Sequence, residues 1–111
     1  MNRRSFATAA IAAALASGLP PAGKAQKARP RRVDIRGSRF RPERLEVRIG
    51  ERVEFTNSDG TPHTATAIDG SWDTRDLSKG EAEVITVKAG MTRRYVCRYH
   101  PAMKAELVIV N

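Results

Sequence analysis

The sequence predicts an all-β domain, built as a sandwich or barrel of short strands. In one short segment after another, apolar residues alternate with charged ones, which is the periodicity of half-buried strands. Turn-forming pairs such as Gly50-Glu51 and Ala89-Gly90 separate these segments. Beyond residue 25 no segment shows the spacing of an amphipathic helix. A series of strands with turn signals between them is typical of sandwiches and barrels.

Six segments carry the alternation, and each has the length of a single strand. In chain order they are centred on Val33 and Ile35, on Leu45, Val47 and Ile49, on Val53 and Phe55, on Ile85 and Val87, on Tyr95 and Cys97, and on Leu107 to Val110. A domain of this size has a small core, so each large side chain in it matters. The expected core aromatics are Phe40, Phe55, Trp72 and Tyr95, with a surface cleft as the other possible place for Trp72.

The first 25 residues have the layout of an export signal peptide. A basic start is followed by an uncharged, alanine-rich stretch over residues 6–19 and by the small-residue cleavage pattern Gly23-Lys24-Ala25. The apolar stretch is too short for a spanning helix, which argues against the alternative of a membrane anchor. Asn2-Arg3-Arg4-Ser5-Phe6 also resembles the twin-arginine export motif, although the general secretory route stays open. We expect cleavage after Ala25 and a bacterial periplasmic location.

Residues 26–32 are polar and basic and are expected to form a flexible lead into a domain over 33–111. The chain carries 20 Lys and Arg against 12 Asp and Glu, a net charge of +8. Removing residues 1–25 removes three of these cations, so 17 against 12 leaves +5. Export and the lack of interleaved aromatics argue against nucleic-acid binding. We expect a monomer without stable membrane insertion, whose basic surface steers an acidic redox partner towards it.

The only cysteine and the only two histidines fall into two short segments. His63 lies in Pro62-His63-Thr64, whereas Cys97 and His100 lie in a seven-residue segment that ends at Met103. Two imidazoles, one thiolate and a weak axial thioether are the ligands of type 1 copper. A lone cysteine in an oxidising compartment cannot form an intramolecular disulfide, which favours a bound state. The sequence therefore predicts one copper ion held by His63, Cys97, His100 and Met103.

Other interpretations of these residues remain. Taken singly, a buried cysteine or methionine packs like any apolar side chain, and a lone histidine is usually a surface or hydrogen-bonded residue. Zinc could use Cys97 and both histidines, but a thioether is a poor zinc ligand. Asp59, near His63, is the one nearby carboxylate that could act as a general base in a zinc enzyme.

The chain resembles the cupredoxins, the small blue-copper electron carriers. The pattern Phe40-x-Pro42-x-x-Leu45-x-Val47-x-x-Gly50-x-x-Val53-x-Phe55-x-Asn57 is similar to the family's N-terminal strands, and Pro62-His63-Thr64 is similar to its first-ligand loop. Tyr95-x-Cys97-x-x-His100-Pro101-x-Met103-Lys104 is similar to the loop with the other ligands. The short Cys-x-x-His-x-x-Met spacing is most like that of the amicyanin branch.

This resemblance implies a Greek-key, cupredoxin-like β-sandwich with copper near one end. It implies that His63, Cys97 and His100 are equatorial ligands, that Met103 is axial, and that the edge of His100 is the electron port. The implied docking patch around the port comprises Pro62, Tyr99, Pro101 and Ala102, and the implied supporting groups are Asn57 and the N–H of Thr64.

The expected function is one-electron transfer between periplasmic redox partners, without enzymatic activity. The alternative is a periplasmic copper-binding or delivery protein in copper homeostasis, which could use the same four donors. A carrier keeps its copper through many redox cycles, whereas a delivery protein releases it to a partner or a modest chelator.

Overall fold

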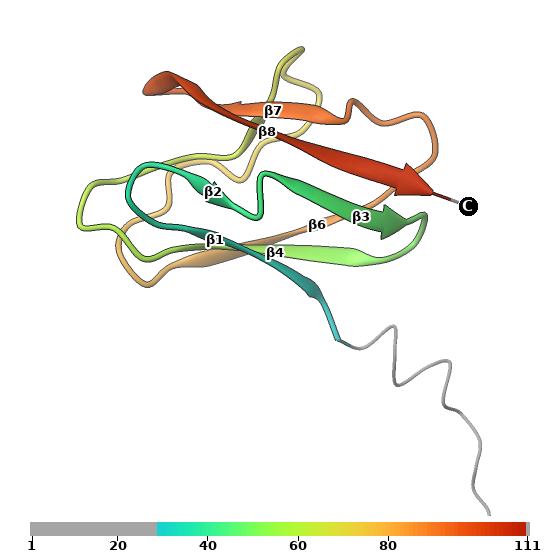
Figure 1. The fold of residues 1–111 in the computed structure, drawn as a ribbon, viewed down its shortest axis with the longest axis horizontal. Helices are drawn as coiled ribbons and strands as arrows, with labels where there is room; N and C mark the ends of the chain where they lie inside the picture. The colour runs from blue at the N-terminus through green and yellow to red at the C-terminus, as the bar shows by residue number, and fades with distance from the viewer. Residues whose placement is uncertain (1–28, 111) are drawn as a thin grey trace, which may run out of the picture.

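The protein is a sandwich of two four-stranded sheets. A computed structural model describes residues 29–110, so the signal peptide expected over residues 1–25 lies outside the described residues. One sheet has the order β2 (Phe40–Arg41), β1 (Arg31–Ile35), β4 (Arg52–Asn57), β6 (Ala82–Thr86). The other has the order β3 (Arg44–Arg48), β8 (His100–Val110), β7 (Arg94–Cys97), β5 (Thr66–Ala67), and Figure 1 shows the two sheets as two layers. The predicted all-β sandwich is confirmed.

The chain crosses repeatedly between the two sheets. Between β2 and β7 consecutive strands alternate between the two sheets, whereas β7 and β8 are neighbours in one sheet. The pairs β1–β4 and β3–β8 are parallel, whereas the remaining pairs are antiparallel. Segments far apart in the sequence therefore lie side by side, and this brings the two predicted ligand segments to one end. Within residues 29–110 there is no helix, and so none long and apolar enough to cross a membrane.

Aromatic side chains fill the space between the sheets. Phe40, Phe55 and Tyr95 are fully buried, and the ring of Tyr95 lies 4.8 Å from that of Phe40 and 5.3 Å from that of Phe55. Trp72 is half-buried, packs 5.4 Å from Tyr95, and donates its Nε1–H to the Thr92 carbonyl at 2.8 Å. It also lines a surface cavity of about 510 Å³, so Trp72 belongs both to the core and to a surface cleft.

Tyr95 places a polar hydroxyl group inside this apolar core. Its hydroxyl is buried without a hydrogen-bond partner among the described residues, and burial raises the pKa of Tyr95 above its ordinary range. The hydroxyl therefore stays neutral inside the apolar layer.

Four strands differ from the sequence-based expectation. The strand β1 begins at Arg31, inside the stretch expected as a flexible lead, because Arg31 and Arg32 pair in parallel with Val53 and Glu54 of β4. The strands β2 and β5 have two residues each, too few to leave a periodic pattern. The strand β8 begins at His100 and not near Leu107, so part of the expected ligand loop is a strand.

Candidate metal centre

The hairpin between β7 and β8 brings Cys97 and His100 together. Cys97 ends β7, His100 begins β8, and these two residues are cross-strand partners on either side of a two-residue turn. The register shifts between Val96 and Cys97, because Val96 pairs with Lys104 whereas Cys97 pairs with His100, so residues 101–103 of β8 fall between two paired positions. Such an irregularity bends a strand and re-aims its side chains. The Cys97 side chain is fully buried, whereas His100 on the other strand is exposed.

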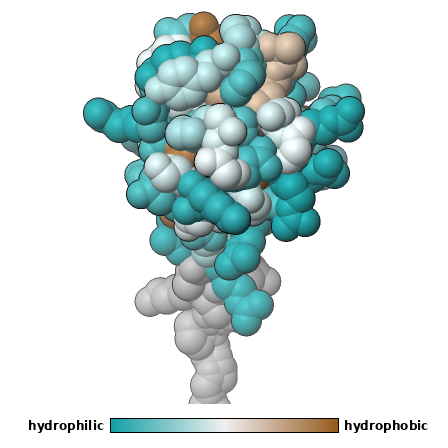
Figure 2. All heavy atoms as spheres, turned by 90° about the vertical axis from the view of Figure 1, so that its left-hand side faces the viewer, coloured by the Kyte–Doolittle hydropathy of each residue, from teal (hydrophilic) through white to brown (hydrophobic). Residues whose placement is uncertain are grey.

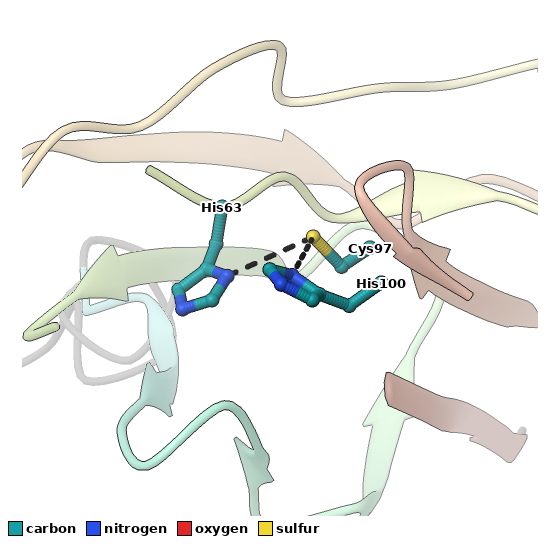
Figure 3. Close-up of side chains that lie close together, drawn as sticks. All are labelled: His63, Cys97 and His100. Atoms are coloured by element: carbon teal, nitrogen blue, oxygen red, sulfur yellow. Dashed lines mark hydrogen bonds between the residues drawn. The ribbon is translucent and has the colours of Figure 1, made fainter. Parts of the chain in front are cut away.

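A separate segment brings His63 to this hairpin. His63 lies between β4 and β5 and pairs with Leu77 by two backbone hydrogen bonds of 3.1 and 2.8 Å. Its side chain is fully buried, although Pro62 directly before it is exposed. The crossovers of the sandwich therefore place the first histidine beside the cysteine from the opposite side, as Figure 3 shows.

The donor atoms of these three residues converge. They lie within 4.8 Å of one another, and the Nδ1 atoms of His63 and His100 lie 3.7 and 3.9 Å from Cys97 Sγ. With metal–nitrogen and metal–sulfur bonds of about 2.0 and 2.3 Å, nitrogen and sulfur are about 3.7 Å apart at a trigonal angle and about 3.5 Å apart at a tetrahedral one. The observed spacings thus fit a shared ion with a trigonal N2S arrangement, the arrangement of type 1 copper.

Met103, the fourth predicted donor, is on β8 three residues after His100. It is 6% exposed and packs in the same buried cluster as Cys97. Together with His100 it also lines a surface hollow.

The residues of the implied docking patch are all exposed; they are Pro62, Tyr99, Pro101 and Ala102. Soft sulfur donors beside two imidazoles form a set that suits copper better than zinc.

Comparison with known proteins agrees with the copper-type arrangement of the donor atoms. A model of the cupredoxin-like domain matches residues 6–109. The chain belongs to this cupredoxin family. It is 28% identical over 118 residues to amicyanin-alpha of Methylorubrum extorquens (strain ATCC 14718 / DSM 1338 / JCM 2805 / NCIMB 9133 / AM1), with 98% of this chain and 99% of the relative covered.

Solved amicyanin structures share the fold of this cupredoxin. An oxidized amicyanin mutant in which a methionine is replaced by leucine superposes with a TM-score of 0.67 at 24% identity, covering 72% of this chain and 81% of the other. A reduced amicyanin mutant in which a tryptophan is replaced by tyrosine gives a TM-score of 0.64 at 24% identity, covering 73% and 82%. The predicted cupredoxin family and the likeness to amicyanin are confirmed. Members of the family hold one copper ion; His63, Cys97 and His100 form a cluster that fits it, and Met103 lies in the same buried core as Cys97.

In this cupredoxin Asp59 anchors His63. The Oδ2 atom of Asp59 lies 2.9 Å from His63 Nε2 and accepts the Ser38 N–H at 2.8 Å, while its Oδ1 accepts the Gly37 N–H at 2.8 Å. The Ser38 N–H, followed by that of Gly37 and the His63 ring, lowers the pKa of Asp59, and burial partly offsets this. The ionised carboxylate can only accept, so a neutral His63 carries its proton on Nε2 and turns the lone pair of Nδ1 towards Cys97.

The two expected supporting residues have different roles. The N–H of Thr64 lies 3.5 Å from Cys97 Sγ, the hydrogen bond that the resemblance implies. Asn57 instead holds the turn before His63, because its side-chain amide donates to the carbonyls of Thr61 and Leu77 at 2.9 and 2.8 Å. Its Oδ1 accepts the Asp59 N–H at 3.0 Å, so Asn57 also fixes the carboxylate that orients His63.

A closed chain of hydrogen bonds supports the Cys97 side of the site. The Arg98 N–H donates to the Thr64 hydroxyl at 2.9 Å, and this hydroxyl lies 2.8 Å from that of Thr66. The Thr66 hydroxyl donates to Asp73 Oδ1 at 3.0 Å, and the other oxygen of Asp73 pairs with the Arg98 guanidinium. The backbone of Arg98 is thus tied directly to Thr64, whose N–H faces Cys97 Sγ, and its guanidinium is tied to Thr66 through Asp73.

The sequence analysis did not assign the contact of Asp59 with His63 or the pair of Asp73 with Arg98. The sequence identifies Asp59 only as a carboxylate near His63; its position four residues before His63, in a turn, is the signal that could have indicated the contact. Asp73 is 25 residues from Arg98, and no local pattern links the two.

Proposed function

We propose that this cupredoxin is an exported, periplasmic type 1 copper protein that carries single electrons between redox partners and turns over no substrate. His63, Cys97 and His100 are the proposed equatorial ligands, and Met103 is the proposed axial ligand. The observation that carries the proposal is the convergence of three donor atoms within 4.8 Å, with the buried thioether of Met103 on the same hairpin strand. A copper ion held there would supply a one-electron Cu(I)/Cu(II) couple.

The surroundings of the donors favour a carrier. Asp59 and the Leu77 pairing fix His63, and the Thr64 and Arg98 contacts fix the start of the hairpin turn. A site held in this way needs little rearrangement when its charge changes, which favours rapid electron transfer. Exposed His100 offers a route from the buried site to the surface, with exposed Tyr99, Pro101 and Ala102 around it.

The periplasmic part of the proposal rests on residues 1–25. Their basic start, uncharged apolar stretch and small-residue cleavage pattern match an export signal. Expression of the full chain in a bacterium, followed by fractionation and N-terminal sequencing, tests this part. We expect a periplasmic product that begins at Gln26; a product that keeps residues 1–25 in the membrane fraction would contradict it.

The test of the copper assignment is spectroscopic. Cu(II) is added to the reduced protein, and visible absorption and electron paramagnetic resonance are recorded. We expect an intense visible band with narrow copper hyperfine splitting. A colourless protein that binds Cu(I) or Zn(II) tightly would overturn the type 1 assignment.

A second measurement separates an electron carrier from a copper-delivery protein. The copper protein is cycled repeatedly between its oxidised and reduced forms in the presence of a modest Cu(I) chelator. A carrier retains its copper and its visible band through these cycles. Progressive transfer of copper to the chelator would favour delivery instead.

A further inference from the structure

The two flanks of His100 differ in how their charges are compensated. On one flank Arg98 pairs with Asp73, and the Tyr99 hydroxyl donates to Asp76 at 2.7 Å. This flank, with Arg75 beside it, borders one surface hollow and holds two cations against two carboxylates. We refer to it as the Asp73 flank, and its formal charge is zero.

The opposite flank is a hollow beside β2, with a volume of about 690 Å³. His100 and Met103 line one side of it, and Arg39, Glu43 and Lys104 supply its charged groups. Both cations are exposed, and within residues 29–110 neither forms an ion pair. We refer to this hollow as the β2 flank; its two cations against one carboxylate leave it positive.

More positive charge adjoins the β2 flank. Arg41 is exposed, and its Nε–H donates to the backbone carbonyl of Arg36 at 3.4 Å and not to a carboxylate. The end of the molecule with the β7–β8 hairpin, at the left of Figure 1, is mostly hydrophilic with small apolar areas, as Figure 2 shows. On such a surface, orientation of a partner depends on charge more than on a broad apolar contact.

We propose that an acidic redox protein docks on the β2 flank, with its carboxylates against Arg39 and Lys104 and its redox group facing His100. This inference rests on the proposed electron-carrier function for the nature of the partner. Cations already neutralised within the chain, such as Arg98, gain little from a partner's carboxylates. Uncompensated cations beside the port both attract and orient the partner.

The test maps the binding of acidic probes on the isotope-labelled copper(I) protein by NMR. The first probe is hexacyanochromate(III), a paramagnetic trianion that broadens nearby amide signals, and the second is a decaglutamate peptide. We expect both probes to perturb residues 38–43 and 102–104 and to leave residues 73–76 unchanged. Raising the ionic strength should weaken both effects.

Charge-neutralising variants make the test specific. In the double variant Arg39→Gln/Lys104→Gln, we expect decaglutamate to bind about 2- to 30-fold more weakly, the combined range for two exposed ion pairs. The matched control is Arg75→Gln/Lys88→Gln, which removes the same charge from the Asp73 flank and from Lys88 after β6. This control should retain most of the affinity.

Three results would overturn the proposal. They are perturbation centred on residues 73–76, an equal loss of affinity in the control variant, and binding of hexacyanochromate(III) without binding of decaglutamate, which would indicate a site for small anions only. The same sample, once oxidised, reports separately on the proposed function through its visible spectrum. A missing band with probes still mapped to the β2 flank would contradict the carrier function and leave the acidic-docking surface standing.

Discussion

The Nδ1 atoms of His63 and His100 both face Cys97 Sγ, yet the two side chains have opposite surroundings. His63 is fully buried, its second ring nitrogen is held by Asp59, and its backbone pairs with Leu77. His100 is exposed at the start of β8, and its Nδ1 faces Cys97. The comparison teaches that one histidine keeps the geometry of the site while the other gives access to it. Predictions for the two sides therefore differ in kind.

The largest effect is expected from Cys97→Ser, which removes the atom that both histidines face. The intense visible band of the copper protein should disappear, because it depends on charge transfer from the thiolate. Visible absorption after addition of Cu(II) is the measurement, with far-ultraviolet circular dichroism to show that the sheets persist. An unchanged band in a folded variant would show that Cys97 is not a ligand.

The next effect is expected from Asp59→Asn, which acts on the buried histidine alone. An amide has one acceptor oxygen for the three donors that now face the carboxylate, so the orientation of His63 loses its support. Copper affinity should fall by about 10- to 100-fold, the usual cost of losing such a partner. Competition with a chelator measures it. Asp69→Asn, on an exposed carboxylate held by Ser71 and Thr92, is the matched control and should keep full affinity.

A smaller effect on affinity is expected from Met103→Leu. Copper should remain bound, because the equatorial donors are intact, and the reduction potential should rise on loss of the axial thioether. Voltammetry of the purified variant gives the potential. A lowered potential would argue that Met103 is not axial.

The smallest effect is expected from Asp73→Asn, which breaks the ion pair with Arg98. Arg98 is about half exposed, with 53% of its side chain accessible, so the pair should contribute only about 0.5 kcal/mol to the free energy of unfolding. Chemical denaturation measures this loss. A loss of several kcal/mol would mean that the hydrogen-bond chain through Thr66 and Thr64 acts as one unit.

Sequence reasoning succeeded where the signal is local. Strict alternation around Leu45 and Val53 predicted β3 and β4, because a strand with one buried face repeats every two residues. The candidate donors were found because cysteine and histidine are rare in this chain and gather in two segments. The fold then brought three of these donors together, as the spacing and the resemblance predicted.

The remaining features depend on topology, which no local pattern records. Pairing with β4 orders Arg31 and Arg32, although their own sequence reads as a polar lead. The contact of Asp59 with the turn at Gly37 and Ser38 and the pair of Arg98 with Asp73 join segments more than 20 residues apart. The pair of Arg98 with Asp73 helps to make the charge around His100 asymmetric, so composition alone predicts a basic protein but not the position of its basic flank.

Three of the four proposed donors occupy seven consecutive residues, whereas His63 is 34 positions away from Cys97. An unfolded chain can therefore still present Cys97, His100 and Met103 to a metal ion, and folding adds only the fourth donor. A bound ion stabilises a protein only by the difference between its affinities for the folded and unfolded chain. Copper should consequently raise the thermal midpoint by less than its tight native binding suggests, with His63 and the carboxylate behind it setting most of the gain.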